Sequence, residues 1–368
     1  MKQQIHKKKF ESILHSCHTR KASDIHISGT NPVVFRVNCV LTPLSEHIFD
    51  NSEISDMARE ILSREKWEEY KRTKNLDFSY ALENGVRFRI NLYFERGETA
   101  FAIRRLESSK YTLEQLGLPP QLDKLGTLKD GLVLFTGPTG SGKSTSLAAI
   151  IDQINTNRSC HILTIEDPVE YVHNNKKSLV HQRELGIDVH TFSDALRAAL
   201  REDPDVILVG EMRDLETIRA AVTAAETGHL VFSTLHTNDT VGVVDRIIAS
   251  YPAQEQSMVQ RQLASTLRAV VAQRLLPSSD GKGRVAAIEV LLSSTAISNL
   301  IRSGQSEQIY SVLETSASSG MQSMDNSLAS HVNSAKLDKN AALPFVRNKT
   351  LFNNLIEQGV KPPVSRRR

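Results

Sequence analysis

The stretch that most constrains the fold is residues 131–146, which read GLVLFTGPTGSGKSTS. It begins with a short apolar run, residues 132–135, of the kind that forms a buried strand in a parallel sheet. A turn rich in glycine follows, and residues 145–154 then have the pattern of a helix. The sequence therefore predicts a strand, a tight loop and a helix in direct succession, which is a building unit of α/β folds.

The turn itself fits the phosphate-loop pattern G-x-x-x-x-G-K-[ST]. Glycines let the backbone curl so that several N–H groups point at one phosphate chain. We expect the Lys143 ammonium to reach the β- and γ-phosphates and the Ser144 hydroxyl to ligate Mg²⁺. The sequence thus predicts binding of a nucleoside triphosphate with Mg²⁺. The predicted nucleotide-binding residues are Gly137, Pro138, Thr139, Gly140, Ser141, Gly142, Lys143, Ser144 and Thr145.

The chain in front of this stretch predicts a small α+β domain over residues 1–107, with antiparallel strands. Residues 108–120 contain Ser, Gly and Pro but few apolar core positions, which favours a linker. Turn dipeptides such as Asn84-Gly85 separate the later strands. The predicted helices are 8–20 and 53–70, and the predicted strands are 24–28, 33–37, 76–81, 86–94 and 99–106.

After the linker, apolar strands alternate with helices, which predicts a mostly parallel sheet covered on both faces over residues 121–292. Residues 293–368 predict a helical C-terminal region. The fold class is therefore α/β, with a smaller α+β domain in front. Besides the first strand and helix, the predicted strands are 161–165, 206–209, 230–234 and 284–291, and the helices up to residue 292 are 193–202, 214–227, 240–250 and 253–275.

Acidic residues follow two of the predicted strands. Glu166 and Glu170 come after one, and Glu211 comes after another, separated from it by Gly210. Ligands bind at the carboxyl ends of strands in open α/β sheets, so these carboxylates are expected to face the phosphates. We select Glu211 to polarise the attacking water, and Glu211 and Glu170 with Ser144 as metal ligands. The alternative is that these acids cap helices or pair with arginines such as Arg213.

Two histidines bracket the predicted strand 230–234. His236 lies at its carboxyl end, where it can contact the γ-phosphate or respond to its loss. His229 lies at the opposite end and is expected to be a packing or interface residue. At seven residues apart, the two histidines do not form a metal-binding pair.

The composition excludes several other classes of protein. The three cysteines are scattered, with no C-x-x-C pair, which argues against a disulfide framework and a zinc site and fits a reducing cytosol. No apolar run approaches the roughly 18 residues of a membrane helix, so we expect no transmembrane segment. A formal net charge of +3 and an aromatic content of 5% offer neither a basic groove nor a stacking platform for nucleic acid.

Four segments together resemble the signature boxes of the secretion ATPase superfamily, known as Walker A, Asp box, Walker B and His box. They read GPTGSGKST, TIEDPVEY, LRAALREDPDVILVGEMRDLETI and AAETGHLVFSTLHTND, in the family order. KASDIHIS, AISNLIR and GMQSMD further resemble elements of the PilT-type ATPases, which retract type IV pili. The resemblance covers roughly residues 10–335. Ser298 departs from the family's AIRNLIR motif by replacing its first arginine.

This resemblance implies a homohexameric ring of subunits, each with a PAS-like front domain and a RecA-like back domain. It implies hydrolysis of ATP between subunits, with Glu211, Glu166 and His236 as catalytic residues. It also implies an arginine supplied by a neighbour, with Arg104 as our choice over Arg87 and Arg89. The implied setting is the cytoplasm, at the inner face of the cytoplasmic membrane, where the ring acts on a pilus platform protein and indirectly on pilin subunits in twitching motility.

Two alternative functions remain open from the residues. A pilus-extension or type II secretion ATPase shares the four boxes, although such enzymes usually carry a four-cysteine zinc element. A catalytically idle accessory subunit would bind nucleotide without turnover.

Two further arginines are candidates for the site. On the predicted helix before Walker B, Arg197 and Arg201 lie four residues apart on one face, where they could reach a phosphate or an acid.

Overall fold

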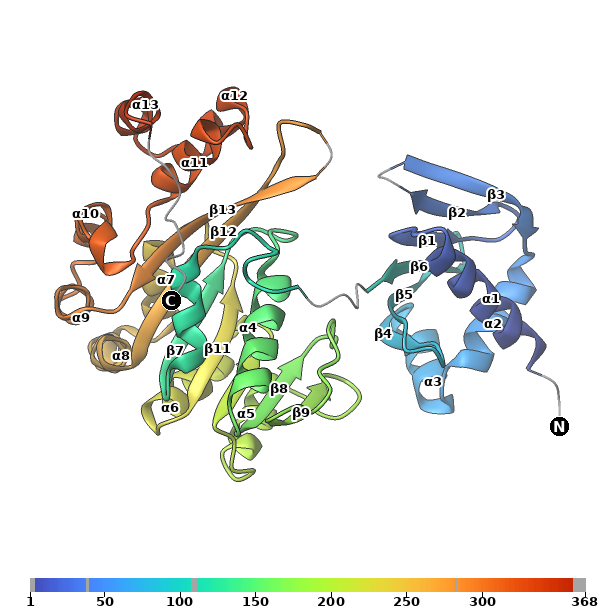
Figure 1. Ribbon diagram of the computed structural model, residues 1–368. Helices are drawn as coiled ribbons and strands as arrows, with labels where there is room; N and C mark the ends of the chain where they lie inside the picture. The colour runs from blue at the N-terminus through green and yellow to red at the C-terminus, as the bar shows by residue number, and fades with distance from the viewer. Residues whose placement is uncertain (1–3, 38–39, 107–110, 282, 360–368) are drawn as a thin grey trace. The chain divides into compact units, whose positions relative to one another are not determined.

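The computed structural model describes residues 4–37, 40–106, 111–281 and 283–359 of the chain. It divides into two compact units (Figure 1). The first contains the chain up to residue 109 together with residues 168–172, and the second contains 110–167 and everything after 172. The first three residues of the predicted linker, 108–110, fall outside the described ranges.

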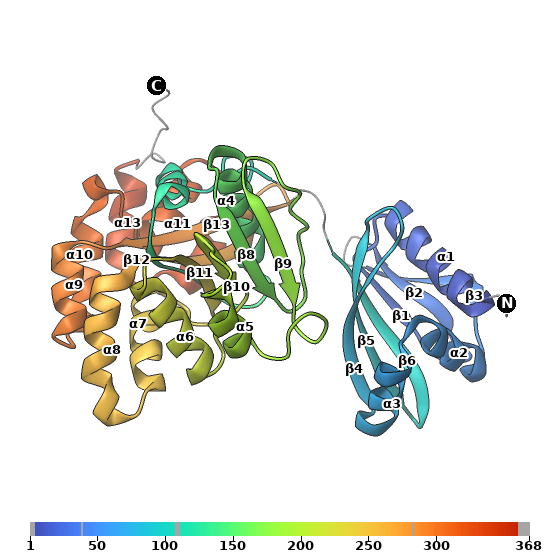
Figure 2. The same ribbon diagram turned by 90° about the horizontal axis from the view of Figure 1, so that it is seen from below.

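The first unit is an antiparallel sheet with the strand order β3-β2-β1-β6-β5-β4 and helices packed against it (Figure 2). Its core joins apolar residues from α1 and α2, such as Phe10 and Met57, with the inward side chains of the strands, such as Phe88 and Phe101. The elements are α1 (Ile5–Thr19), β1 (Asp24–Ile27), β2 (Pro32–Val37), β3 (Val40–Ile48), α2 (Asn51–Ile61), α3 (Arg64–Thr73), β4 (Asn75–Ala81), β5 (Arg87–Glu95) and β6 (Glu98–Arg105).

Two predictions for this unit were wrong. The single helix expected over 53–70 is two helices, because Leu62 is extended and the Ser63 side chain accepts a hydrogen bond from the Lys66 N–H and starts α3. Strand β3 was missed. It is an edge strand with mostly exposed side chains, so its sequence lacks the apolar alternation that identified its neighbours.

The second unit is a seven-stranded sheet with the order β13-β12-β7-β11-β10-β8-β9, parallel except for β13. This confirms the predicted α/β class. The 3₁₀ helix η1 (Pro120–Thr127) precedes it. The elements are β7 (Gly131–Thr136), α4 (Lys143–Asn157), β8 (His161–Glu166), β9 (Leu179–Glu184), α5 (Phe192–Ala199), β10 (Val206–Val209), α6 (Leu215–Glu226), β11 (Leu230–Leu235), α7 (Thr240–Ser250), α8 (Ala253–Thr266), β12 (Leu267–Pro277), β13 (Arg284–Leu292), α9 (Thr295–Arg302), α10 (Ile309–Thr315), α11 (Met324–Asn333), α12 (Lys339–Ala342) and α13 (Lys349–Glu357).

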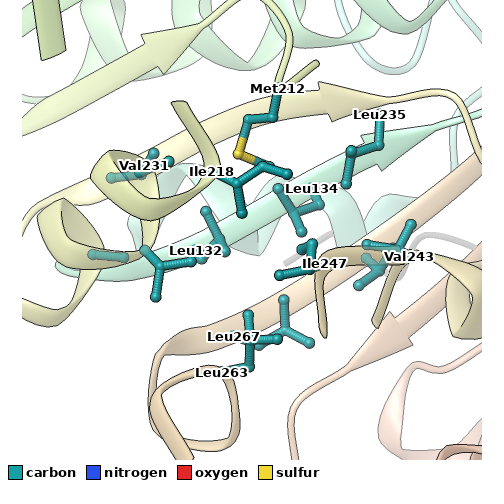
Figure 3. Packing of buried hydrophobic residues seen from close by; sticks show 14 of the residues in the cluster. Leu132, Leu134, Met212, Ile218, Val231, Leu235, Val243, Ile247, Leu263 and Leu267 are labelled. Atoms are coloured by element: carbon teal, nitrogen blue, oxygen red, sulfur yellow. The ribbon is translucent and has the colours of Figure 1, made fainter. Parts of the chain in front are cut away.

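Separate apolar clusters cover the two faces of this sheet. On one face, side chains of α5 to α10 pack on the strands, and Figure 3 shows part of this cluster, including Leu134, Ile218 and Val243. On the other face, η1 and α4 pack against Val133, Phe135 and their neighbours. A further cluster joins α11 to α13 with Leu276 of β12 and Ala287 of β13. The central strands are thus buried on both sides, as their uniform apolar runs predict.

Two predictions for the second unit also need correction. The helix expected over 253–275 ends at Thr266, and the chain continues as strand β12 between β7 and β13. Its apolar run fits a helix or a strand by composition, and only the ladders with β7 and β13 decide between them. Leu113 and Leu118 of the predicted linker are buried in the cluster that contains α4, so residues from 111 onward belong to the second unit.

Candidate active site

The phosphate loop connects β7 to α4 through a backbone that only glycine fits at two points. At Gly137 φ is +140°, and a Cβ atom there would lie 2.2 Å from the backbone carbonyl oxygen of Gln273. At Gly142 φ is +90°, and a Cβ atom would lie 2.7 Å from the Gln273 side-chain nitrogen. Strand β12 therefore lies directly against the loop, and this contact limits the backbone conformations that the loop can adopt.

The charged and polar groups of this loop are arranged to receive an anion. The Lys143 ammonium is buried and donates to the carbonyl oxygens of Gly137 and Pro138, at 2.8 and 3.1 Å. The buried Ser141 hydroxyl has no hydrogen-bond partner among the residues that the structure describes. Helix α4 begins at Lys143 behind Gly142, which has no side chain to cap the helix. The start of α4, with its positive dipole end, therefore lies directly behind the loop, which is the arrangement that binds phosphate in proteins.

Strand register brings the other candidate residues to the same edge of the sheet. In the parallel ladders, Val209 of β10 pairs with Ile165 of β8 and with Ser233 of β11. Leu235 of β11 pairs with Thr136, the last residue of β7. Glu166, Glu211, His236 and Gly137 come at or just beyond these paired positions, so they all lie along one carboxyl edge.

The Glu211 carboxylate lies between two side chains on this edge, those of Arg213 and His236. Its Oε1 accepts from the Arg213 guanidinium at 2.5 Å, and its Oε2 is 3.2 Å from Nε2 of His236. The Glu211 side chain is only 13% exposed, whereas Arg213 and His236 are 68% and 48% exposed. The pairing with Arg213 is the alternative that the sequence left open, and the same carboxylate also contacts the predicted histidine.

Side-chain bonds tie these strand ends to one another. The Thr237 N–H donates to the Thr136 hydroxyl at 2.9 Å, and that hydroxyl lies 2.7 Å from the Thr237 carbonyl. The Thr234 hydroxyl donates to the Gly210 carbonyl at 2.7 Å. The first link joins the His236 segment to the strand that carries the phosphate loop, and the second joins β11 to the Glu211 segment.

Comparison with known proteins agrees with this geometry. Residues 1–337 match the family model described as "Type II/IV secretion system protein". The chain is 49% identical over 296 residues to the "Twitching motility protein" of Neisseria gonorrhoeae, which covers 80% of this chain and 79% of that one.

The chain belongs to the type II/IV secretion system protein family. It is 44% identical over 304 residues to the "Type IV pilus retractation ATPase PilT" of Pseudomonas aeruginosa PAO1, covering 83% of this chain and 88% of the relative. A solved structure, "Crystal Structure of the Pilus Retraction Motor PilT and Bound ADP", superimposes with a TM-score of 0.87 at 41% identity, covering 93% of this chain and 98% of that one. The protein is therefore a PilT-type ATPase.

Two further acidic residues were predicted at the site, Glu166 and Glu170. Glu166 Oε1 accepts from the Thr164 hydroxyl at 2.7 Å and from the Gln182 amide at 3.2 Å, so its carboxylate is already engaged by protein donors. Glu170 falls in residues 168–172, which group with the first unit, and its role as a metal ligand stays a prediction.

The candidate arginines all have partners within the chain: Arg89, Arg104 and Arg197 pair with acids, Arg201 donates to a backbone carbonyl and Arg87 donates to the Ser79 hydroxyl. Arg104 donates to the Asp24 carboxylate at 3.0 Å while remaining 69% exposed. Burial acts to raise the pKa of Asp24, but hydrogen bonds from Ser23 and Arg104 outweigh it, so that pKa is lowered. Arg197 pairs with Glu216 at 2.6 Å. The Asp24 side chain is only 16% exposed and also lies 3.8 Å from Arg36, so its carboxylate keeps a cationic neighbour if Arg104 turns to another partner.

Gln273 is the site residue that sequence reasoning missed. It is 3% exposed, and its Oε1 accepts from the Ser146 hydroxyl of α4 at 2.8 Å. Its backbone and side chain also set the limits on Gly137 and Gly142 described above. A lone glutamine in the apolar run of β12 was a usable signal, but the segment was predicted as helix.

Among the described helices, none combines the length and apolar character needed to cross a bilayer.

Proposed function

We propose that this ATPase is a homohexameric motor that hydrolyses ATP to power type IV pilus retraction and twitching motility. It would work in the cytoplasm, at the inner face of the cytoplasmic membrane, on a pilus platform protein and through it on pilin subunits. The observation that carries the proposal is the common edge shared by the phosphate loop, Glu211 and His236. The names of the relatives in Neisseria and Pseudomonas support the pilus as the object of the work.

In this proposal the loop N–H groups and the start of α4 hold the phosphates, and Lys143 turns from the loop carbonyls to the β- and γ-phosphates. Mg²⁺ would be held by the exposed Ser144 hydroxyl, with Glu211 and Glu170 as further candidates. The hard oxygen donors of a serine and carboxylates fit this ion, which neutralises phosphate charge when bound.

Glu211 would orient the attacking water. Each carboxylate oxygen has two lone pairs, so Glu211 can hold Arg213 and His236 and still accept a hydrogen bond from water. Its two partners fix the plane of the carboxylate, which limits the positions that such a water can take. Arg104 of a neighbouring subunit would stabilise the charge on the transferred phosphoryl group, and Glu166 would support the edge.

The test compares Glu211→Gln with Glu216→Gln, a matched change in an exposed glutamate that pairs with Arg197. We expect Glu211→Gln to bind ATP but to turn it over on the order of 10²-fold more slowly. This slowing corresponds to an activation free energy that is higher by about 2.7 kcal/mol. Glu216→Gln should keep normal turnover, and Lys143→Ala should lose nucleotide binding. Cells carrying only Glu211→Gln should extend pili without retracting them. Retraction at the normal rate in those cells would contradict the proposal.

The trans arginine is tested by mixing two inactive variants. Glu211→Gln and Arg104→Ala subunits should regain some turnover when combined, because part of the mixed interfaces contains one intact set of groups. We also expect the specific activity to fall on dilution as the ring dissociates. Full activity of a dilute monomer would exclude a site shared between subunits.

A further inference from the structure

A buried carboxylate stands in strand β13, outside the catalytic edge. Glu289 is 4% exposed, and its Oε1 accepts from both the backbone N–H and the hydroxyl of Thr240, at 2.9 and 2.8 Å. Its Oε2 accepts from the backbone N–H of Met324 at 3.2 Å. All three partners are donors, so the group serves as an acceptor on both oxygens. Burial raises the pKa of Glu289, and the bonds from Thr240 and Met324 act in the opposite direction.

The Thr240 side of this contact leads directly to the catalytic edge. Thr240 is the first residue of α7 and comes four residues after His236. Between them, Thr237 is bonded to Thr136 at the end of β7. The short segment 236–240 is therefore held at one end by the strand of the phosphate loop and at the other end by Glu289.

The Met324 side leads to the C-terminal helices. Met324 is the first residue of α11, and the preceding Gln322 exchanges two backbone hydrogen bonds with Val290 of β13, at 2.8 and 3.0 Å. The residue after Met324, Asp325, accepts from the N–H groups of Arg347 and Asn348, at 2.9 and 2.8 Å, where α13 begins. A movement of Glu289 would thus change the positions of both α11 and the start of α13.

The first turn of α7 has free volume beside it. A cavity of about 590 Å³ is bordered by Asp239, Gly242 and Glu289, and by Tyr310, Met324 and Arg347 from the C-terminal region. The Tyr310 hydroxyl bonds to Asp239, and the Arg347 guanidinium lies over the Tyr310 ring at 3.0 Å from its centroid. On this side the start of α7 is held by polar contacts, whereas Val241 and Val243 of the same helix are buried in the main apolar cluster.

We infer that Glu289 is a positioning residue that couples the His236 segment to α11, so that nucleotide at the phosphate loop changes the stability of the C-terminal helices. If α7 moves away, a buried charge and its donors lose their partners, so β13 and α11 must follow. The inference rests on the proposed nucleotide site. A purely structural role would lower stability without altering the response of α11 to nucleotide.

The variant that isolates the contact is Glu289→Gln. The amide oxygen can still accept from Thr240, but the amide nitrogen then faces the Met324 N–H, donor against donor. The matched control is Asp325→Asn. It also changes a buried carboxylate to an amide, but Asp325 lies in α11 and accepts from Arg347 and Asn348 rather than from α7. A second variant, Thr240→Val, removes only the hydroxyl and retains the backbone donor, in case Glu289→Gln does not fold.

The experiment is amide hydrogen exchange of the full chain by mass spectrometry, with and without ADP, read on peptides from residues 324–333. We expect ADP to slow exchange there in the unmodified protein and in Asp325→Asn, and this effect to be lost in Glu289→Gln and reduced in Thr240→Val. An unchanged ADP effect in Glu289→Gln, or no ADP effect in the unmodified protein, would overturn the inference. Binding of a fluorescent ADP is measured in parallel, because its absence from the unmodified protein would instead refute the proposed nucleotide site.

Discussion

Replacing single glycines of the phosphate loop with alanine tests whether β12 sets the shape of the loop. Gly137→Ala adds a Cβ atom 2.2 Å from the Gln273 carbonyl oxygen, at a φ of +140°. Gly140→Ala is the matched control, since φ is +78° and its Cβ atom would meet nothing within 4 Å. Both variants adopt a strained backbone, but only the first also collides with another strand.

The magnitudes follow from these two terms. A non-glycine residue in the left-handed region costs about 1–2 kcal/mol, which is the whole expected effect of Gly140→Ala. Gly137→Ala has a backbone strain of about 1–3 kcal/mol and an overpacking cost of about 1–3 kcal/mol, because a backbone carbonyl cannot turn aside as a side chain can. We therefore expect Gly137→Ala to lower the free energy of unfolding by about 2–6 kcal/mol in the absence of nucleotide.

The assay is urea unfolding followed by far-ultraviolet circular dichroism. Trp67, the single tryptophan of the chain, lies in the first unit, so its fluorescence transition is an internal control. Equal destabilisation by Gly137→Ala and Gly140→Ala would refute the reasoning. A second comparison sharpens it: Gln273→Ala should partly relieve Gly142→Ala, which collides with the glutamine side chain, but not Gly137→Ala, which collides with its backbone.

Two further predictions concern the C-terminal region. In α9, Ile301 is 1% exposed whereas Leu300 is only partly buried, so Ile301→Ala should destabilise the protein by about 2–5 kcal/mol in the same unfolding assay and Leu300→Ala by clearly less. Burial lowers the pKa of His331 below its usual value near 6.5, against the effect of its bond to the Ala286 carbonyl. Since the unfolded chain then binds the proton more readily, this contribution to stability is present at neutral pH and is lost as the pH falls below about 6.5. The melting temperature should fall between about pH 7 and pH 5, and less steeply in His331→Gln, which can keep the donor to Ala286.

The features that the sequence predicts well are those that depend on neighbouring residues. The strand, loop and helix around Lys143 follow from an apolar run, spaced glycines and a helix start, all within one short stretch. Glu211 was found because it follows an apolar strand and a glycine, and it does lie at the carboxyl edge beside His236. In each case the local pattern determines the edge of the sheet at which the residue lies.

The features that were missed depend on contacts between distant segments. The edge strands β3 and β9 were not predicted, because their pairing partners rather than their own apolar pattern define them. Strand β12 was taken as the end of a helix, and Gln273 was lost with it. The pairing of Glu211 with Arg213 was foreseen only as an alternative, because two residues of separation permit a contact without requiring it.

The β12–β13 pair explains why a buried polar residue was overlooked there and what it contributes. In their antiparallel ladder, Ala272 pairs with Glu289 and Gln273 pairs with Ile288, so Glu289 and Gln273 point to opposite faces of the sheet. Gln273 lies on the face of α4 and contacts the phosphate loop, while Glu289 lies on the face of α7 and contacts the segment after His236. Apolar periodicity treats both as interruptions of a buried strand. Their hydrogen bonds instead make this pair of strands the place where nucleotide loop, His236 segment and C-terminal helices are joined.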